Sequence, residues 1–183
     1  MHTPLPFDAA EVVRFWRDAG PSRWFRKDDA FDSEFRERFL AAHEAAARGE
    51  LDAWSRTAEG ALALLILLDQ FPRNSFRGTP RMFATDAQAR AIARAAVDAS
   101  LDDQVDAQLR SFFYLPFEHS ESMEDQDLSV QLSARAGDDA LKWARLHRDI
   151  IERFHRFPHR NAVLGRATTP DEQQFLASGG FAG

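Results

Sequence analysis

The chain has 183 residues, of which 44% are hydrophobic and 28% are charged, a balance typical of one globular domain rather than of a disordered protein. Its formal net charge of -6 argues against nucleic-acid binding, because such a molecule repels polyanions. It has no cysteine, which excludes disulfides, thiolate catalysis and cysteine-ligated metal centres. We therefore expect a single domain over residues 1–183.

The sequence gives no sign of membrane targeting. Asp8 and Glu11 interrupt the first sixteen residues, which lack a basic region before an apolar stretch, so no secretory signal is expected. The aliphatic run at 61–68 stops at Asp69, far short of the roughly 20 residues that a membrane span needs. These features predict a cytoplasmic protein without membrane partners.

Helical spacing recurs along the first half of the chain. Four helices are predicted, from Asp8 to Gly20, from about Asp32 to Gly49, from about Asp52 to Asp69, and from Thr85 through Ala96. The third is apolar on nearly all sides, which predicts the central buried helix.

The second half continues the pattern. Four more helices are predicted, from Val105 to Phe113, from Ser122 to Gly137, from about Asp138 to His155, and from the N-cap Thr169 onward. In the seventh we expect Trp143, Ile150, Ile151 and Phe154 to point inward. No alternating run typical of a strand occurs, so the sequence predicts an all-α protein of about eight helices with no sheet. Short connections favour antiparallel helix hairpins.

Asp69 lies at the C-terminal end of the most apolar predicted helix, where the helix dipole disfavours a carboxylate. It therefore needs a partner, for which Arg73, Arg77, Arg110 and Arg160 are candidates. A structural ion pair, or a cap on the turn at Pro72, is the favoured reading.

Opposite charges are concentrated in two later segments. Residues 115–127 contain five acidic residues and no Lys or Arg, whereas Arg153, Arg156, Arg160 and Arg166 occur in 153–166 without an acid. If the segments pair, the arginines rigidify the fold; any that stay free suit a carboxylate or phosphate.

Four histidines, His119, His147, His155 and His159, belong to the same half of the chain. The Glu-x-x-His spacing of di-iron helices occurs once, at Glu152 and His155, so we expect no metal and no cofactor. His119, flanked by Glu118 and Glu121, is the best candidate for acid–base catalysis.

Three segments together resemble a known bacterial family, domain of unknown function 924: residues 67–74 (LLDQFPRN), 114–121 (YLPFEHSE) and 156–161 (RFPHRN) with 164–166 (LGR). The resemblance extends over nearly the whole chain and implies a tetratricopeptide-like, right-handed arrangement of helical hairpins, but no known activity. His155 departs from the family pattern, which has glycine there. The polar positions that match the pattern are Asp69, Arg73, Asn74, Arg110, Glu118, His119, Glu121, His159, Arg160 and Asn161.

Three hypotheses follow for these polar motifs. In the first, they gather in one pocket of an interaction module that binds a small anionic ligand or a peptide carboxylate through Arg73, Arg110 and Arg160. In the second, the protein is an acid–base enzyme of hydrolase type, with His119 oriented by Glu118 or Glu121 and an anion stabilised by Arg160. In the third, the motifs are purely structural.

Overall fold

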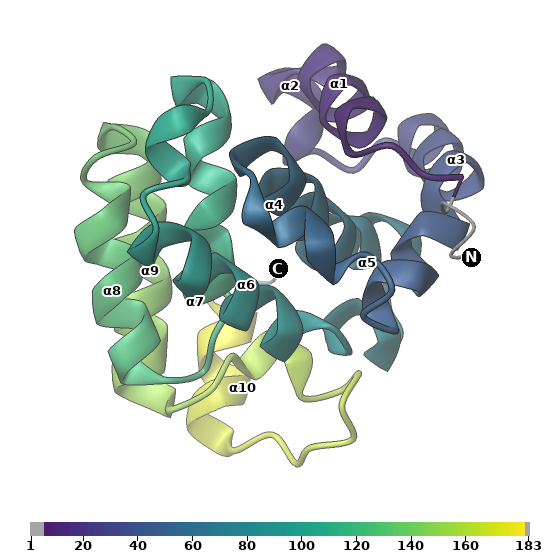
Figure 1. The fold of residues 1–183 in the computed structure, drawn as a ribbon. Helices are drawn as coiled ribbons and strands as arrows, with labels where there is room; N and C mark the ends of the chain where they lie inside the picture. Colours follow the sequence, from purple (N-terminus) through teal and green to yellow (C-terminus); the bar gives the residue numbers. More distant parts are fainter. Residues whose placement is uncertain (1–5, 182–183) are drawn as a thin grey trace. The chain divides into compact units, whose positions relative to one another are not determined.

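The computed structural model describes residues 6–181 of the protein (Figure 1). Residues 1–5, which begin the segment expected to lack a signal peptide, and residues 182–183 lie outside the described part. All regular elements between residues 6 and 181 are helical, which confirms the predicted all-α class. None of these helices combines the length and the apolar character needed to cross a bilayer.

The elements comprise α-helices, short 3-10 helices and one π-helical turn, η2. In chain order they are α1 (Ala9–Ala19), α2 (Pro21–Trp24), α3 (Asp29–Ala47), η1 (Asp52–Arg56), α4 (Ala58–Leu65), η2 (Ile66–Gln70), α5 (Phe71–Ser75), η3 (Pro80–Phe83), α6 (Asp86–Asp98), η4 (Asp102–Gln104), η5 (Ala107–Phe113), α7 (Leu115–Glu118), α8 (Met123–Ser133), α9 (Asp138–Phe154), η6 (Pro158–Arg160) and α10 (Pro170–Ala177).

The chain groups into two compact units. Unit 1 holds the chain up to Arg77 together with Arg81–Pro116, and unit 2 holds Gly78–Pro80 and the chain from Phe117 onward. The single domain over residues 1–183 stays a prediction.

α4 is the buried centre of unit 1. Residues 61–68, which include the first part of η2, are at most 1% exposed. α1, α6, η1 and η5 all pack against α4. Burial on every side explains why this segment is apolar all round rather than along one stripe. The prediction of a central buried helix is confirmed.

Pro72 changes the hydrogen bonding at the end of this helix. In a continuous α-helix, the amide of residue 72 would donate to the carbonyl of Leu68, but proline has no N–H. The chain forms the π-helical turn η2, in which the amide of Phe71 donates to the carbonyl of Ile66. Thr85 Oγ1 replaces the missing bond by donating to the Leu68 carbonyl over 2.5 Å.

The π-helical turn also removes the α-helical donor of the Leu67 carbonyl. His43 Nδ1 lies 2.8 Å from that oxygen. Because a carbonyl only accepts, Nδ1 carries the hydrogen. Burial lowers the pKa of His43, so the ring donates as a neutral imidazole. This bond attaches α3 to the core helix.

Aromatic side chains join α1, α2 and α3. The rings of Phe15 and Phe35 stack with 5.4 Å between centroids, and Trp16 lies 5.3 Å from Phe35. Trp24 donates its indole N–H to the carbonyl of Trp16 over 2.6 Å. Phe31, Phe35 and Phe39 are spaced by four residues, which places them on one face of α3.

Unit 2 is built on a helical hairpin of α8 and α9, which lie side by side (Figure 1). Ile150 and Ile151 of α9 and Phe157, which follows the helix, form a small buried apolar cluster. α10 contacts η6 and begins at the capping box predicted from Thr169, whose side chain accepts from the amide of Glu172.

Some predicted helices differ in their bounds. The second begins at Asp29 rather than Asp32, because Asp28 acts as its N-cap by accepting from the amide of Phe31. The segment expected as one helix from Asp52 is divided, because Thr57 caps a new start by accepting from the amide of Gly60. The predicted fifth helix is the 3-10 helix η5.

Three side chains differ from what helix capping and apolar periodicity suggest. Thr85 and Ser122 precede α6 and α8 as predicted, but neither side chain caps its helix. The hydroxyl of Thr85 donates to the carbonyl of Leu68 instead. Trp143, expected to point inward, is 48% exposed.

His155 ends α9 with φ of 57°, in the left-handed region that favours glycine. We predict that His155→Gly raises the free energy of unfolding by roughly 0.5–1 kcal/mol. Glycine adopts the left-handed conformation without strain, and the strain relieved outweighs the extra conformational entropy of the unfolded chain. Urea denaturation measures the change.

The control is Glu152→Gly, within α9, which should lower the free energy of unfolding by about 1 kcal/mol. Losses of similar size in both variants would show that the backbone of His155 is not strained.

Candidate functional site

The first polar motif, at the end of η2, is held in a buried ion-pair network. Arg73 Nη1 lies 3.2 Å from Asp69 Oδ1, and the same guanidinium donates to both oxygens of Asp86 over 2.8 and 3.0 Å. Gln70 donates to the other oxygen of Asp69 over 2.7 Å. Arg73 is thus a partner of the buried carboxylate, as one of the sequence alternatives expected.

Arg110 lies in η5 beside the acidic turn η4. Its Nε donates to the carbonyl of Asp102 over 3.2 Å, and its Nη1 lies 3.7 Å from Asp103 Oδ1. Tyr114 donates to the side chain of Asp102 over 2.7 Å. Arg110 therefore fastens the η4 turn to η5.

Asn74 contacts a different carboxylate from that of Arg73. Its Nδ2 donates to Asp32 Oδ1 over 2.7 Å, and Arg77 Nε donates to Asp32 Oδ2 over 2.9 Å. These three side chains line a small polar pocket beside α3 and α5. Asn74 is the residue of the first motif that reaches a pocket.

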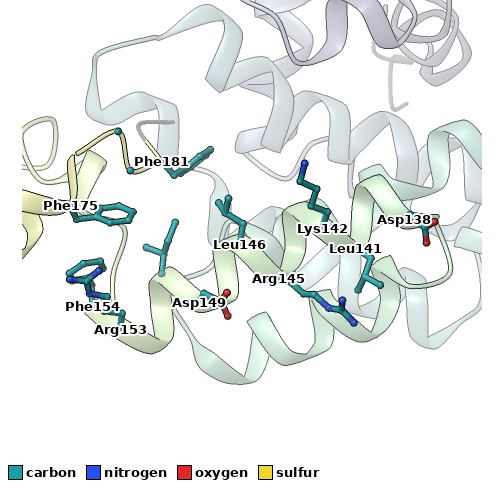
Figure 2. Close-up of a pocket in the computed structure, with 13 residues that line it drawn as sticks. Asp138, Leu141, Lys142, Arg145, Leu146, Asp149, Arg153, Phe154, Phe175 and Phe181 are labelled. Carbon is teal, nitrogen blue, oxygen red and sulfur yellow. The ribbon is translucent and has the colours of Figure 1, made fainter. Parts of the chain in front are cut away.

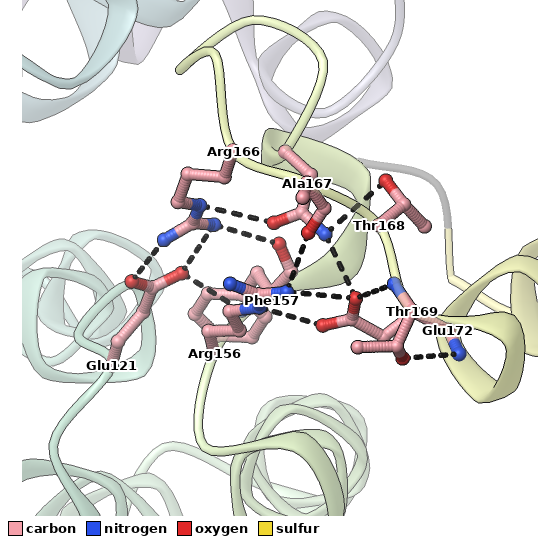
Figure 3. Close-up of polar contacts among 9 residues, drawn as sticks. Glu121, Arg156, Phe157, Arg166, Ala167, Thr168, Thr169 and Glu172 are labelled. Carbon is pink, nitrogen blue, oxygen red and sulfur yellow. Dashed lines mark hydrogen bonds and ion pairs between the residues drawn. The ribbon is translucent and has the colours of Figure 1, made fainter.

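In unit 2, Figure 3 shows a polar network around two glutamates. Arg166 donates to both oxygens of Glu121 over 2.8 and 3.0 Å, and the amide of Phe157 donates to the same carboxylate over 2.8 Å. Burial alone would raise the pKa of Glu121, but the bonds from Arg166 and Phe157 outweigh it, so the pKa is lowered.

Glu172 is the second glutamate of this network (Figure 3). Arg156 binds both of its oxygens at 2.6 and 2.9 Å, and Asn161 and the amide of Thr169 donate to it over 3.1 and 2.8 Å. These bonds, led by that of Arg156, lower the pKa of Glu172 to about 2. Arg166 also donates to Asn161 over 3.0 Å, which joins the two halves of the network.

His147 is a buried neutral histidine. Its Nδ1 lies 2.9 Å from the carbonyl of Trp143 and 3.2 Å from Glu118 Oε1. Burial is the main cause that lowers the pKa of His147 to about 3. The ring is therefore uncharged near neutral pH, so its contact with Glu118 is not a pairing of two full charges.

The other histidines of the motifs lie near His147. The rings of His119 and His147 are 6.5 Å apart, and Arg160 donates to the carbonyl of His119 over 2.9 Å. The guanidinium of Arg160 lies 4.5 Å from the ring centroid of Phe157, whose ring also lies 5.6 Å from His159. The third motif and His119 thus meet around one phenylalanine.

The contacts of the polar motifs favour some of the hypotheses for these motifs over others. Within residues 6–181, no three side chains of the metal-binding types gather as a metal site would require. Both oxygens of Glu121 already accept from Arg166 and Phe157, which favours a structural role over orienting His119. Catalysis by His119 with Glu118 or Glu121 stays a prediction.

The predicted cluster is divided between the units. Unit 1 contains Asp69, Arg73, Asn74 and Arg110, and unit 2 contains Glu118, His119, Glu121, His159, Arg160 and Asn161. The gathering of both sets in one pocket also stays a prediction.

A groove of about 730 Å³ follows α9 in unit 2 (Figure 2). Its apolar lining comes from α9, from α10 and from the segment after α10, and charged side chains of α9 border it. The apolar side chains are Leu141, Leu146, Ile150, Phe154, Phe175 and Phe181; the charged ones are Asp138, Lys142, Arg145, Asp149 and Arg153.

Glycine permits the chain after α10 to form one end of this groove. A Cβ atom at Gly180 would lie 2.6 Å from the carbonyl oxygen of Phe175, closer than real contacts allow. The chain therefore passes directly beside Phe175 and places Phe181 against His147 and His159, with ring centroids 4.6 and 5.2 Å apart.

Sequence reasoning missed the groove because it assigned one inward face to α9. Leu141 and Leu146 lie outside the face that was expected to be buried, and both line the groove. The sequence did indicate a second apolar face, because apolar residues occupy more of the circumference of α9 than a single core-facing stripe would.

The comparisons with known proteins find relatives of unknown function. A family model described as bacterial protein of unknown function, DUF924, matches residues 12–180. A solved structure, the protein of unknown function ATU0120 from Agrobacterium tumefaciens, is 54% identical with a TM-score of 0.91, and the match covers 93% of this chain and 97% of that chain. No curated protein matches the chain.

We predict that Glu172→Gln lowers the free energy of unfolding by roughly 1–3 kcal/mol at pH 7, because Arg156 loses its charged partner. Glu172 has a lowered pKa in the folded state, so its carboxylate stabilises the fold above pH 4.5 and loses this effect as the pH falls toward about 2. The difference from wild type should shrink over that interval in denaturant titrations.

Glu152→Gln is the matched control, since Glu152 is exposed and pairs with Arg148 on the surface of α9. It should change stability by at most about 0.5 kcal/mol. A pH-independent effect of Glu172→Gln would contradict the charge assignment.

Proposed function

The chain belongs to DUF924, a family of bacterial proteins of unknown function, and on this premise we propose that it is an interaction module whose α9 groove binds an amphipathic, acidic peptide helix. This keeps the class of binding protein expected from the sequence and moves the site from the polar motifs to the groove. A cytoplasmic location, also expected from the sequence, is part of the proposal.

The shape of the groove supports a helical partner. Its volume of about 730 Å³ is within the range of roughly 300–1,000 Å³ found for binding pockets. It borders much of α9, whose 17 residues span about 25 Å at the helical rise. An elongated apolar surface of this kind suits the apolar face of another helix.

Two cations at the groove, Lys142 and Arg145, favour acidic side chains opposite them on a partner, while Asp138 and Asp149 border the groove as well. Lys142 and Arg145 have no carboxylate within ion-pair distance among residues 6–181, and Figure 2 shows them pointing to opposite sides of α9. Acidic residues on both flanks of a bound helix would meet them. Arg153 adds a third cation, 3.8 Å from Asp171.

Trp143 supplies an exposed aromatic side chain next to the groove. Its ring lies 6.4 Å from that of Phe181, which lines the groove. Tryptophan is enriched among the residues that dominate binding energy, because it buries much area with little loss of conformational freedom. A solvent-exposed tryptophan beside an apolar groove is typical of an interface.

The polar network supports a preformed site. Glu121 and Glu172 fix the chain that follows α9 and the start of α10, both of which precede the segment that carries Phe175 and Phe181. A wall held by such bonds is ordered before the partner arrives, which lowers the entropy lost on binding.

A charge-exchange experiment tests the proposal. Two fluorescein-labelled 16-residue helical peptides share a stripe of Leu and Phe, and carry either Glu or Lys on both flanks. We expect the protein to bind the Glu peptide at least tenfold more tightly in fluorescence anisotropy, and the double variant Lys142→Glu with Arg145→Glu to prefer the Lys peptide.

The control variant combines Arg14→Glu with Arg56→Glu, which changes the net charge equally on exposed positions of unit 1. It should keep the preference for the Glu peptide. Failure to bind either peptide, or equal binding of both by the wild-type protein, would contradict the proposal, as would a dimer in light scattering that disappears in Trp143→Ala.

A further inference from the structure

Unit 1 contains a second pocket, separate from the α9 groove and of different chemistry. It has a volume of about 350 Å³ and lies beside α3 and α5. Its lining is polar throughout, in contrast to the apolar groove of unit 2. The lining residues are Lys27, Asp29, Asp32, Ser33, Arg36, Asn74, Ser75 and Arg77.

Asp32 is already neutralised in this pocket. It accepts from Asn74 and from Arg77, over 2.7 and 2.9 Å. The carboxylate and the guanidinium form a close pair whose charges cancel at the pocket wall. The cations that remain for an anionic ligand are Arg36 and Lys27, and the carboxylate of Asp29 also lies in the lining.

Arg36 is a cation without an acidic partner. Its Nη1 donates to the carbonyl of Ser75 over 2.8 Å, and no carboxylate lies within ion-pair distance of it in the described part of the chain. Its guanidinium also lies 5.3 Å from the ring centroid of Phe76, which orients the fork. The remaining N–H groups are available for an anion.

Lys27 is the second available cation. Its nearest carboxylate is that of Asp29, at 3.6 Å, and both side chains are largely exposed. Such a surface contact is weak and is easily exchanged for a ligand. Arg36 and Lys27 together match the charge of about -2 on a phosphate monoester.

Ser75 provides an independent indication of a ligand. The residue is 9% exposed, and its Oγ is buried without a hydrogen-bond partner among residues 6–181. Buried hydroxyl groups are nearly always satisfied, so an unsatisfied one that belongs to a pocket wall calls for a partner. A serine hydroxyl can rotate between staggered positions to reach one.

We infer that this pocket binds a small phosphate monoester that carries hydroxyl groups, such as a sugar phosphate. Arg36 and Lys27 bind the phosphate, Ser75 donates to it, and the carboxylate of Asp29 accepts from ligand hydroxyl groups. A volume of about 350 Å³ suits a ligand of this size and is too small for a peptide helix.

Titration with ribose 5-phosphate, inorganic phosphate and ribose tests this inference on the full chain. In ¹H–¹⁵N spectra, we expect saturable shifts of the Asn74 and Ser75 amide signals with ribose 5-phosphate, weaker shifts with inorganic phosphate and none with ribose. Arg36→Gln should weaken the affinity for ribose 5-phosphate at least tenfold.

Two further variants separate binding from folding. Ser75→Ala should weaken binding several-fold while leaving the melting temperature unchanged, because its hydroxyl makes no bond in the free protein. Arg14→Gln removes an exposed charge on α1, outside the pocket, and should bind as wild type does.

Two results would overturn the inference: no saturable shift with either phosphate probe, or a loss of affinity in Arg14→Gln equal to that in Arg36→Gln. Neither result depends on the peptide groove, because every variant used lies in unit 1.

Discussion

The missing amide hydrogen of Pro72 determines how unit 1 is assembled. The most buried helix of the unit ends at this residue, so its last carbonyls lose their α-helical donors where no water can replace them. Thr85 and His43 donate to these carbonyls instead, from 17 residues later and 24 residues earlier in the chain than the carbonyls they bind. An unsatisfied buried carbonyl costs about 1–3 kcal/mol, so each of these side chains holds its own segment against the core.

Unit 2 relies more on ion pairs than unit 1, in which the elements pack around the apolar α4. Its buried apolar residues are fewer than those of unit 1, and the segments that follow α9 have little regular structure. Glu121 and Glu172 organise these segments through paired hydrogen bonds from Arg166 and Arg156. Because bidentate pairs have a fixed geometry, they can position a loop that hydrophobic contacts alone would leave variable. The arginine–glutamate pairs of unit 2 thus position loops, whereas Thr85 and His43 of unit 1 satisfy the carbonyls at the end of the core helix.

The sequence predicted those features that depend on local pattern. Helix class, the buried α4 and the capping box at Thr169 all follow from residue spacing and were found as expected. Ion pairs between distant residues were harder to predict. The position of Asp69 at the end of an apolar helix indicated that it needs an arginine, but not that Arg73 would also bind Asp86. The α9 groove and the polar pocket beside α3 and α5 were missed because each is formed by segments that only tertiary packing brings together. The apolar periodicity of one helix does not show which other segment packs opposite that helix.

The distribution of tryptophan gives each unit its own optical signal. Three of the four tryptophans, Trp16, Trp24 and Trp54, belong to unit 1, and Trp143 is the one in unit 2. The indoles of Trp16 and Trp24 are stacked, with 6.3 Å between centroids and 10° between planes, an arrangement that couples their electronic transitions. Near-ultraviolet circular dichroism therefore follows the packing of unit 1, whereas the emission wavelength of the exposed Trp143, isolated by replacing the other three with phenylalanine, follows unit 2. The order in which the two units lose their structure becomes measurable without any added label.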